Sequence, residues 1–298
     1  MTRRLFIHSS AAAAGSLLLP AREEVASESN GPALCYALKD RMIPGKLSLL
    51  EKFELAKKVG FDGIELHVPG QLDLAEALAA ARKSGLPVPG CVNARHWQIK
   101  LSAPTEAERA QALGHLRDSL RESARLGAST CLLVPGVVNE EVSPEQAWER
   151  SITGIRQALP LAAKLGVRIA IENVWNGMFY DPKGPDTQSA ELLRDYLDEI
   201  NSPWVGAYFD IGNHQRFGKP ADWIRTLGHR IVKLDVKDWG RENGFGKIGE
   251  GDVDWPEVRR ALAEIRYHGW ATAEVKGGDE ARLAEILQNM KKHLGGES

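Results

Sequence analysis

The sequence predicts a single α/β domain that folds as a (β/α)8 TIM barrel. Short apolar runs, each of strand length, alternate with longer amphipathic stretches from residue 33 onward. Continuous apolar runs of this kind are typical of parallel strands that are buried on both faces. The eight runs are Leu34–Leu38, Gly63–Val68, Val88–Val92, Thr130–Val134, Val167–Ile171, Val205–Phe209, Ile231–Val236 and Ala271–Val275. Eight alternations favour a closed barrel over an open doubly wound sheet.

The stretches between these runs have the signals of helices. Apolar residues recur at i, i+3, i+4 and i+7, as in Leu113, Leu116, Leu120 and Ala124. Prolines suited to a first helical turn are Pro144, Pro220 and Pro256. Glycines expected to end a helix before the next strand are Gly60, Gly85, Gly127, Gly166 and Gly269.

Composition and motifs indicate which partners and cofactors are not expected. A net charge of −2 and a pI near 6.5 provide no basic face for nucleic acid, so we expect no nucleic-acid partner. No Gly-x-Gly-x-x-Gly follows the first run, so a dinucleotide site is unsupported. Cys35, Cys91 and Cys131 fit neither a zinc motif nor a disulfide framework, and we interpret them as buried structural thiols.

The N-terminus resembles an export signal. Arg3 and Arg4 precede the apolar run Ala11–Leu19, which is too short to span a membrane comfortably. The paired arginines resemble a twin-arginine signal, so the twin-arginine export machinery is an expected partner. We therefore predict an exported, periplasmic protein with a signal and linker at residues 1–30 and the barrel at 31–298; the alternative is an ordinary disordered start.

Acidic residues end several predicted strands, where an α/β barrel builds its active site. Glu172, Asp210 and Glu274 each terminate an apolar run, and an unpaired buried carboxylate is strongly disfavoured. Three such acids at one barrel mouth favour a divalent cation, with Mn²⁺ preferred and Mg²⁺ or Co²⁺ as alternatives. The competing interpretation for each acid is a salt bridge to a neighbouring lysine.

Motifs around these acids resemble the xylose-isomerase-like TIM-barrel family of sugar and sugar phosphate isomerases and epimerases. The resemblance covers residues 33 to about 290. The motifs follow the order of the strands and are Phe61–Glu65, His96-Trp97, Ile171-Glu172-Asn173, Phe209–Asn213, Val236-Lys237-Asp238 and Gly249–Trp255.

The resemblance implies one divalent metal held by a Glu, an Asp, a His and a second Glu. These positions correspond, in order, to Glu172, Asp210, Asp235 and Glu274. The chain departs from the family at the third ligand, because Asp235 replaces the histidine and could bind directly, through water, or not at all. Four carboxylates leave excess negative charge, which Lys233 or Lys237 could offset.

The resemblance also implies that Glu172 and Glu274 are the catalytic proton-transfer pair. A metal that polarises a ketone and its neighbouring hydroxyl stabilises an enediolate, while a carboxylate on each face moves the proton. The substrate contacts that the resemblance implies are His96, Trp97, Asn213, His214 and Arg241. For Glu65 we favour a bond to a neighbouring strand, and for His67 a satisfied position at the rim.

We therefore expect a metal-dependent sugar isomerase or epimerase that acts on an unphosphorylated sugar or keto-sugar, a substrate class suggested by export. The first alternative is a 3-keto-glycoside lyase, which would eliminate a β-substituent from the same enediolate. The alternative from another class is a non-catalytic periplasmic carbohydrate-binding protein, suggested by the missing histidine. Relatives of this kind often form dimers or tetramers, so a homo-oligomer is left open.

Overall fold

The computed structural model describes residues 34–297, which contain a closed barrel of eight parallel strands. The strand order around the barrel is β1, β10, β7, β6, β5, β4, β3, β2. The strands are β1 Leu34–Lys39, β2 Gly63–Val68, β3 Gly90–Asn93, β4 Thr130–Leu133, β5 Arg168–Glu172, β6 Val205–Asp210, β7 Ile231–Val236 and β10 Gly269–Ala273. The predicted barrel is confirmed, whereas the predicted export signal and the boundary at residue 31 lie outside the described residues.

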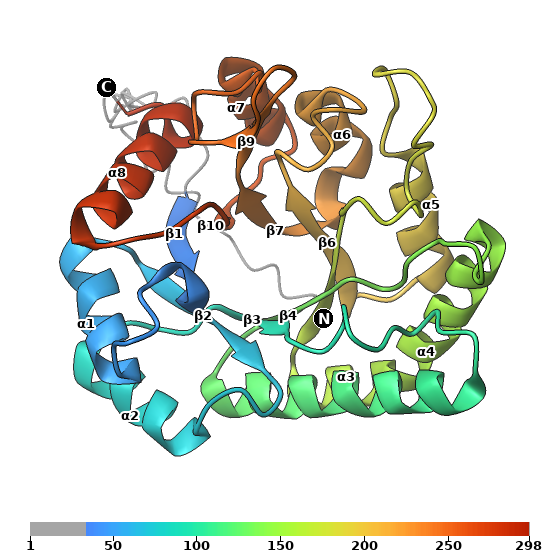
Figure 1. Cartoon of the computed structure of the whole chain (residues 1–298), viewed down its shortest axis with the longest axis horizontal. Coiled ribbons are helices and arrows are strands. Elements are labelled where there is room, and N and C mark those ends of the chain that lie inside the picture. Colours follow the sequence, from blue (N-terminus) through green and yellow to red (C-terminus); the bar gives the residue numbers. More distant parts are fainter. Residues whose placement is uncertain (1–33, 298) are drawn as a thin grey trace, which may run out of the picture. The chain divides into compact units, whose positions relative to one another are not determined.

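Helices surround the ring of strands (Figure 1). They are α1 Leu49–Val59, α2 Leu74–Ser84, α3 Glu106–Leu126, α4 Pro144–Leu165, α5 Glu191–Ile200, α6 Pro220–Leu227, α7 Trp255–Glu264 and α8 Glu280–Met290. Short single turns add the 3₁₀ segments Asp40–Met42 and Gly228–Arg230 and the π turn Lys291–Gly295. Within residues 34–297 no helix is both long and apolar enough to cross a membrane.

Local sequence signals explain most helix ends. Capping boxes begin α1, α3 and α4, where the side chains of Ser48, Thr105 and Ser143 accept backbone hydrogen bonds. Four predicted glycines, Gly60, Gly85, Gly127 and Gly166, end helices in the left-handed conformation. Pro144 and Pro220 begin α4 and α6, and Pro256 is the second residue of α7, so the proline prediction is confirmed.

The prediction for Gly269 is wrong. Helix α7 ends at Glu264, the left-handed residue that follows it is Arg266 with a φ of 54°, and Gly269 begins β10. The interpretation of the cysteines needs one correction as well: all three are free and Cys91 and Cys131 are buried, but Cys35, at the start of β1, is exposed.

The barrel interior contains two layers of buried polar side chains, because alternate residues of a strand point to the same face. The layer at the C-terminal ends of the strands includes Lys39, Glu172, Asp210 and Asp235. The layer below it includes Glu65, Tyr208 and Lys233. An apolar core between strands and helices, with Phe53, Leu120 and Ile155 among its members, supports both layers.

A small antiparallel hairpin follows β7 and was not predicted. Its strands are β8 Asp238–Gly240 and β9 Gly244–Gly246. The carboxylate of Asp238 accepts hydrogen bonds from the backbone N–H of Gly249 at 2.8 Å and from Trp255 Nε1 at 3.0 Å. Through Asp238, these bonds join β8 of the hairpin to the following loop and to the start of α7. They hold the hairpin beside the barrel mouth.

Candidate active site

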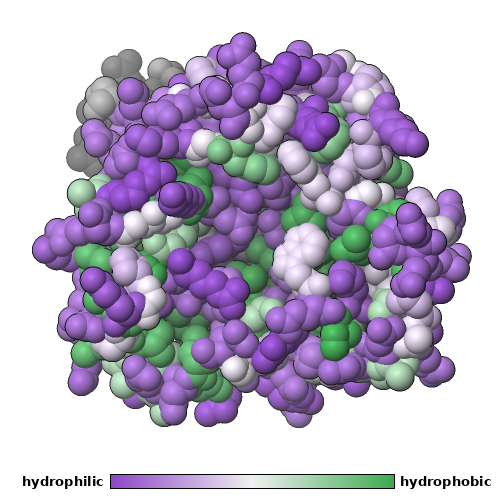
Figure 2. Space-filling model, in the orientation of Figure 1, coloured by the Kyte–Doolittle hydropathy of each residue, from purple (hydrophilic) through white to green (hydrophobic). Residues whose placement is uncertain are grey.

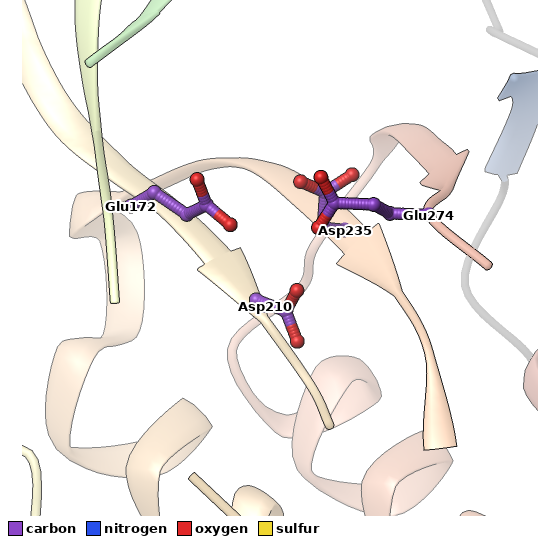
Figure 3. A group of neighbouring side chains, drawn as sticks. All are labelled: Glu172, Asp210, Asp235 and Glu274. Carbon is purple, nitrogen blue, oxygen red and sulfur yellow. The ribbon is translucent and has the colours of Figure 1, made fainter. Parts of the chain in front are cut away.

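The four acids predicted as metal ligands meet at the C-terminal end of the barrel (Figure 3). Each carboxyl group offers an oxygen that lies within 4.8 Å of the others. Glu172 and Asp210 end β5 and β6, Asp235 is the penultimate residue of β7, and Glu274 directly follows β10. Asp210 and Asp235 are fully buried, whereas the side chain of Glu274 is one third exposed. The cluster is therefore open to the mouth on the side of Glu274.

Two ammonium groups lie within this cluster. Lys39 Nζ lies 2.7 Å from Asp235 Oδ2 and 2.6 Å from Glu274 Oε1. Lys237 Nζ lies 3.0 Å from Asp210 Oδ2 and 2.5 Å from Glu274 Oε2. Glu274 is thus held between two lysines, one on each oxygen.

Lys39 is a site residue that the sequence analysis missed. It ends the first apolar run just as the acids end theirs, and this signal could have identified it. Of the two lysines predicted to offset the negative charge, Lys237 does so, whereas Lys233 pairs with Glu65 in the layer below. Tyr208, on β6, also donates a hydrogen bond to Glu65, at 2.9 Å, so Glu65 bonds within the barrel as expected, but to strands across the interior rather than to a neighbouring strand.

The surroundings of Glu172 and Glu274 drive their pKa values apart. Burial, followed by repulsion from Glu274, raises the pKa of Glu172 to about 8. Burial would also raise the pKa of Glu274, but Lys39 and Lys237 outweigh burial and hold this pKa well below its ordinary value. At neutral pH Glu172 is therefore protonated while Glu274 is a carboxylate, and a divided pair of this kind can supply an acid and a base.

Burial also disfavours the ionised forms of the other two acids, Asp210 and Asp235. Burial raises the pKa of Asp210 to about 6 although Lys237 opposes the shift. Burial likewise raises the pKa of Asp235, and the ammonium of Lys39 opposes that shift. If all four acids were ionised, as ligands of a cation would be, the four carboxylates and two ammonium groups would leave two negative charges, which one divalent cation would balance.

Three buried carboxylate oxygens test whether the cluster fits a cation. Asp210 Oδ2, Asp235 Oδ1 and Glu274 Oε2 are buried, and Asp235 Oδ1 accepts no hydrogen bond from any described residue. Lys237 contacts Asp210 Oδ2 and Glu274 Oε2 as an ion pair, at 3.0 and 2.5 Å. Carboxylate oxygens are ligands that Mn²⁺ and Mg²⁺ prefer, so the residues present fit a divalent cation.

Three residues expected to contact the substrate lie near the mouth. His96 is buried, its Nδ1 accepts a hydrogen bond from the backbone N–H of Val134 at 3.0 Å, and burial followed by the charge of Lys39 lowers its pKa to about 3. The ring is thus neutral, with its proton assigned to Nε2. Trp97 is 50% exposed and meets His96 edge-on, with ring centroids 5.7 Å apart.

Asn213 contacts the cluster directly. Its Nδ2 donates to Glu172 Oε1 at 3.4 Å and to the carbonyl of Asn173 at 2.9 Å, and its Oδ1 accepts from Lys237 Nζ at 3.2 Å. Asn213 therefore joins a predicted proton-transfer group to one of the two lysines.

The structure does not bring His214 or Arg241 into the cluster. The ring of His214 packs against Trp223 and Tyr180, with centroids 4.4 and 4.9 Å apart. The guanidinium of Arg241 pairs with Asp186 at 2.6 Å, and its side chain is 68% exposed. Their roles as substrate contacts stay predictions, and these surroundings do not favour them.

Aromatic side chains line the mouth beside the acids. Trp175, 39% exposed, donates a hydrogen bond from Nε1 to the carbonyl of Asn213. Phe245, on the hairpin, is 50% exposed and lies 5.3 Å from Trp175 between ring centroids. Figure 2 shows the face over the ring of strands hollowed at its centre, with largely hydrophilic residues in the hollow. His67 pairs with Asp40 at 2.5 Å, so its expected satisfied position is confirmed.

Comparison with known sequences decides the family. The family described as xylose isomerase-like TIM barrel matches residues 53–293 of the chain. The chain belongs to this family. This membership confirms the resemblance inferred from the motifs.

Individual relatives of this family member are epimerases. L-ribulose-5-phosphate 3-epimerase UlaE of Escherichia coli is 26% identical over 271 residues, which cover 84% of this chain and 92% of that protein. Among solved structures, D-allulose 3-epimerase from Methylomonas sp. has a TM-score of 0.71 at 19% identity, covering 88% of this chain and 99% of that chain. The 3-keto-D-glucoside 4-epimerase YcjR of E. coli has a TM-score of 0.70 at 18% identity, covering 87% and 98%. The structural likenesses show a shared fold.

Proposed function

We propose that this chain is a sugar epimerase that depends on a divalent cation and inverts a carbon next to a carbonyl group through an enediolate. The observation that carries the proposal is the cluster of four acids at the barrel mouth, to which Glu172 comes from β5 and Glu274 from the end of β10. Similarity to proteins named as epimerases supports it. Because none of those relatives is named as a lyase, we propose epimerisation rather than elimination.

The four acids of the cluster would hold the cation. When bound there, a divalent cation polarises a carbonyl and its neighbouring hydroxyl. We propose Mn²⁺, with Mg²⁺ or Co²⁺ as alternatives, because every ligand is a carboxylate oxygen. The four ligands would be Glu172, Asp210, Asp235 and Glu274.

Inversion needs one group that removes a proton and another that returns a proton from the opposite side. Glu274 is suited to accept the proton, because two lysines keep it ionised. Glu172, the other glutamate of the cluster, would return a proton to the opposite face of the carbon. The two glutamates come from β5 and the end of β10, which β6 and β7 separate in the barrel, so they reach the substrate from different sides.

We propose that the substrate is an unphosphorylated sugar or keto-sugar. This part of the proposal depends on the predicted export, and the exposed rings of Trp97, Trp175 and Phe245 support it, since aromatic faces suit the apolar faces of sugars. His96 and Asn213 would bind hydroxyl groups, because both are polar groups at the mouth beside the cluster.

Hydrogen exchange tests the proposed reaction. The purified protein, stripped of metal and reloaded with Mn²⁺, is incubated in D₂O with L-ribulose, D-allulose or L-ribulose 5-phosphate. Proton NMR then measures deuterium incorporation next to the carbonyl and formation of the epimer. We expect exchange that requires the cation and is faster with an unphosphorylated ketose.

A matched pair of variants separates catalysis from binding. Glu172→Gln should abolish exchange, whereas Glu54→Gln, on the exposed face of α1, should leave it unchanged. Sugar binding in calorimetry without exchange would instead indicate a carbohydrate-binding protein. If no substrate exchanges with any of the three cations, the epimerase proposal is refuted.

We also propose export to the periplasm by the twin-arginine machinery, on the basis of Arg3 and Arg4. Cells that express the full chain should contain the protein in the periplasmic fraction. Replacing both arginines by lysine should retain it in the cytoplasm. Equal periplasmic recovery of the double variant would contradict twin-arginine export.

A further inference from the structure

The two lysines of the cluster are held in different ways. Lys39 donates hydrogen bonds to Asp235 Oδ2 and Glu274 Oε1, and its side chain is only 5% exposed. Lys237 Nζ lies 3.0 Å from Asp210 Oδ2, 2.5 Å from Glu274 Oε2 and 3.2 Å from Asn213 Oδ1. Its side chain is also more exposed, at 15%. Lys39 is therefore bonded to carboxylates alone in a more buried position, whereas Lys237 also has a neutral partner and is more exposed.

The oxygens that Lys237 contacts are ones that Lys39 leaves available to a cation. Asp210 Oδ2 and Glu274 Oε2 are buried against Lys237, and Asp235 Oδ1, in the same cluster, accepts no hydrogen bond from any described residue. Lys39 occupies the opposite oxygens of Asp235 and Glu274. A divalent cation could therefore bind while Lys39 stays in place, but it would meet the ammonium of Lys237.

An ammonium group and a divalent cation repel each other strongly at contact distance in a buried site. Lys237 has another place available. Asn213 Oδ1, a neutral acceptor, already lies 3.2 Å from its Nζ, and the half-exposed ring of Phe245 lies 5.4 Å from it. A change of side-chain torsions toward these groups would clear the oxygens without leaving the ammonium unpartnered.

We propose that Lys237 is an internal counter-ion of the cation site. Its ammonium occupies the cation position between Asp210 and Glu274 in the cation-free protein and moves toward Asn213 when a divalent cation binds. The inference rests on the proposed function, because it requires that the four acids bind a cation. Lys237 would therefore lower the affinity for the cation, and its ammonium would occupy the cation position when no cation is bound.

Cation affinity is the first test, with Mn²⁺ alone as the probe in equilibrium dialysis. Lys237→Met removes the competing ammonium, so we expect Mn²⁺ to bind about tenfold or more tightly than to the unsubstituted protein. Lys39→Met removes the same charge from the same cluster without clearing the cation position, and its gain should be clearly smaller. Equal gains in Mn²⁺ affinity in the two variants would show that net charge alone explains the effect, and would overturn the proposal.

Lysine reactivity is the second test and needs no variant. Acetic anhydride labelling of the intact protein, read by mass spectrometry, reports how accessible each amine is. Saturating Mn²⁺ should increase labelling of Lys237 several-fold while Lys39 stays protected with and without the cation. Stoichiometric Mn²⁺ binding with unchanged labelling of Lys237 would overturn this inference alone. A protein that binds no Mn²⁺ would overturn both this inference and the cation dependence of the proposed function.

Discussion

The buried ion pair beneath the site allows a quantitative prediction about stability. Glu65 and Lys233 pair one layer below the four acids, and their side chains are 0% and 1% exposed. Replacing Lys233 by Met leaves the carboxylate of Glu65 buried without its counter-charge, which typically costs about 3–5 kcal/mol in the free energy of unfolding. Tyr208 still donates to Glu65 Oε2 at 2.9 Å, so we expect a loss near the lower end, about 3 kcal/mol.

Urea unfolding of the metal-free protein measures this loss. The midpoint should fall at an unchanged slope, because the surface exposed on unfolding stays the same. Lys58→Met is the matched control: it breaks the pair between Lys58 and Glu280, whose side chains are 66% and 51% exposed, and should not change stability measurably.

The double variant Glu65→Leu with Lys233→Met tests whether the single variant loses stability through an unpaired charge or through poorer packing. It removes both buried charges together, and apolar replacement of a whole buried pair is often close to neutral. We therefore expect it to be more stable than Lys233→Met alone. A single variant that loses less than about 1 kcal/mol, or a double variant whose loss equals the sum of the single losses, would refute the reasoning.

Three further predictions concern the site and its rim. Binding of Mn²⁺ at pH 7 should release protons, because Glu172, with a pKa of about 8, must lose its proton to become a ligand; calorimetry in two buffers of different ionisation enthalpy measures the release, and none should remain above roughly pH 9. Burial lowers the pKa of His214 to about 3, below the unfolded value of about 6.5. The unfolded chain therefore takes up this proton first, and stability from the neutral ring is lost as the pH falls below about 6.5. In urea midpoints measured from pH 7.5 to 4.5, His214→Gln should fall less steeply than the unsubstituted protein, and parallel curves would contradict this account. Trp97→Ala should raise KM about fivefold, corresponding to about 1 kcal/mol of aromatic contact, with stability unchanged; an unchanged KM would exclude Trp97 as a substrate contact.

Local patterns in the sequence were sufficient to predict the barrel and the position of its acids. The period of the apolar residues depends only on whether a segment is a helix or a strand, and the residue that ends a strand must lie at the barrel mouth. Errors at the ends of elements have local causes. Strand β3 begins at Gly90 rather than Val88, since Val88 lies between Pro87 and Pro89, neither of which can donate a ladder hydrogen bond.

The sequence could not predict which charged groups pair. Lys39 is separated from Asp235 by 196 positions and from Glu274 by 235, and it meets them only because the barrel closes by placing β1 beside β10. The same closure places Lys233 beside Glu65 instead of beside the site, although Lys233 is only two residues from Asp235.

The sequence by itself therefore determined the fold class and the position of Glu172, Asp210 and Glu274 at the ends of apolar runs, because both depend on burial and backbone geometry within a single element. The family resemblance added Asp235. Only the tertiary structure decided the balance of charge, including the two lysines on Glu274 and the opposed protonation of Glu172 and Glu274. Electrostatic interaction depends on distance in space and on burial, and both arise when strands far apart in the sequence close into one barrel.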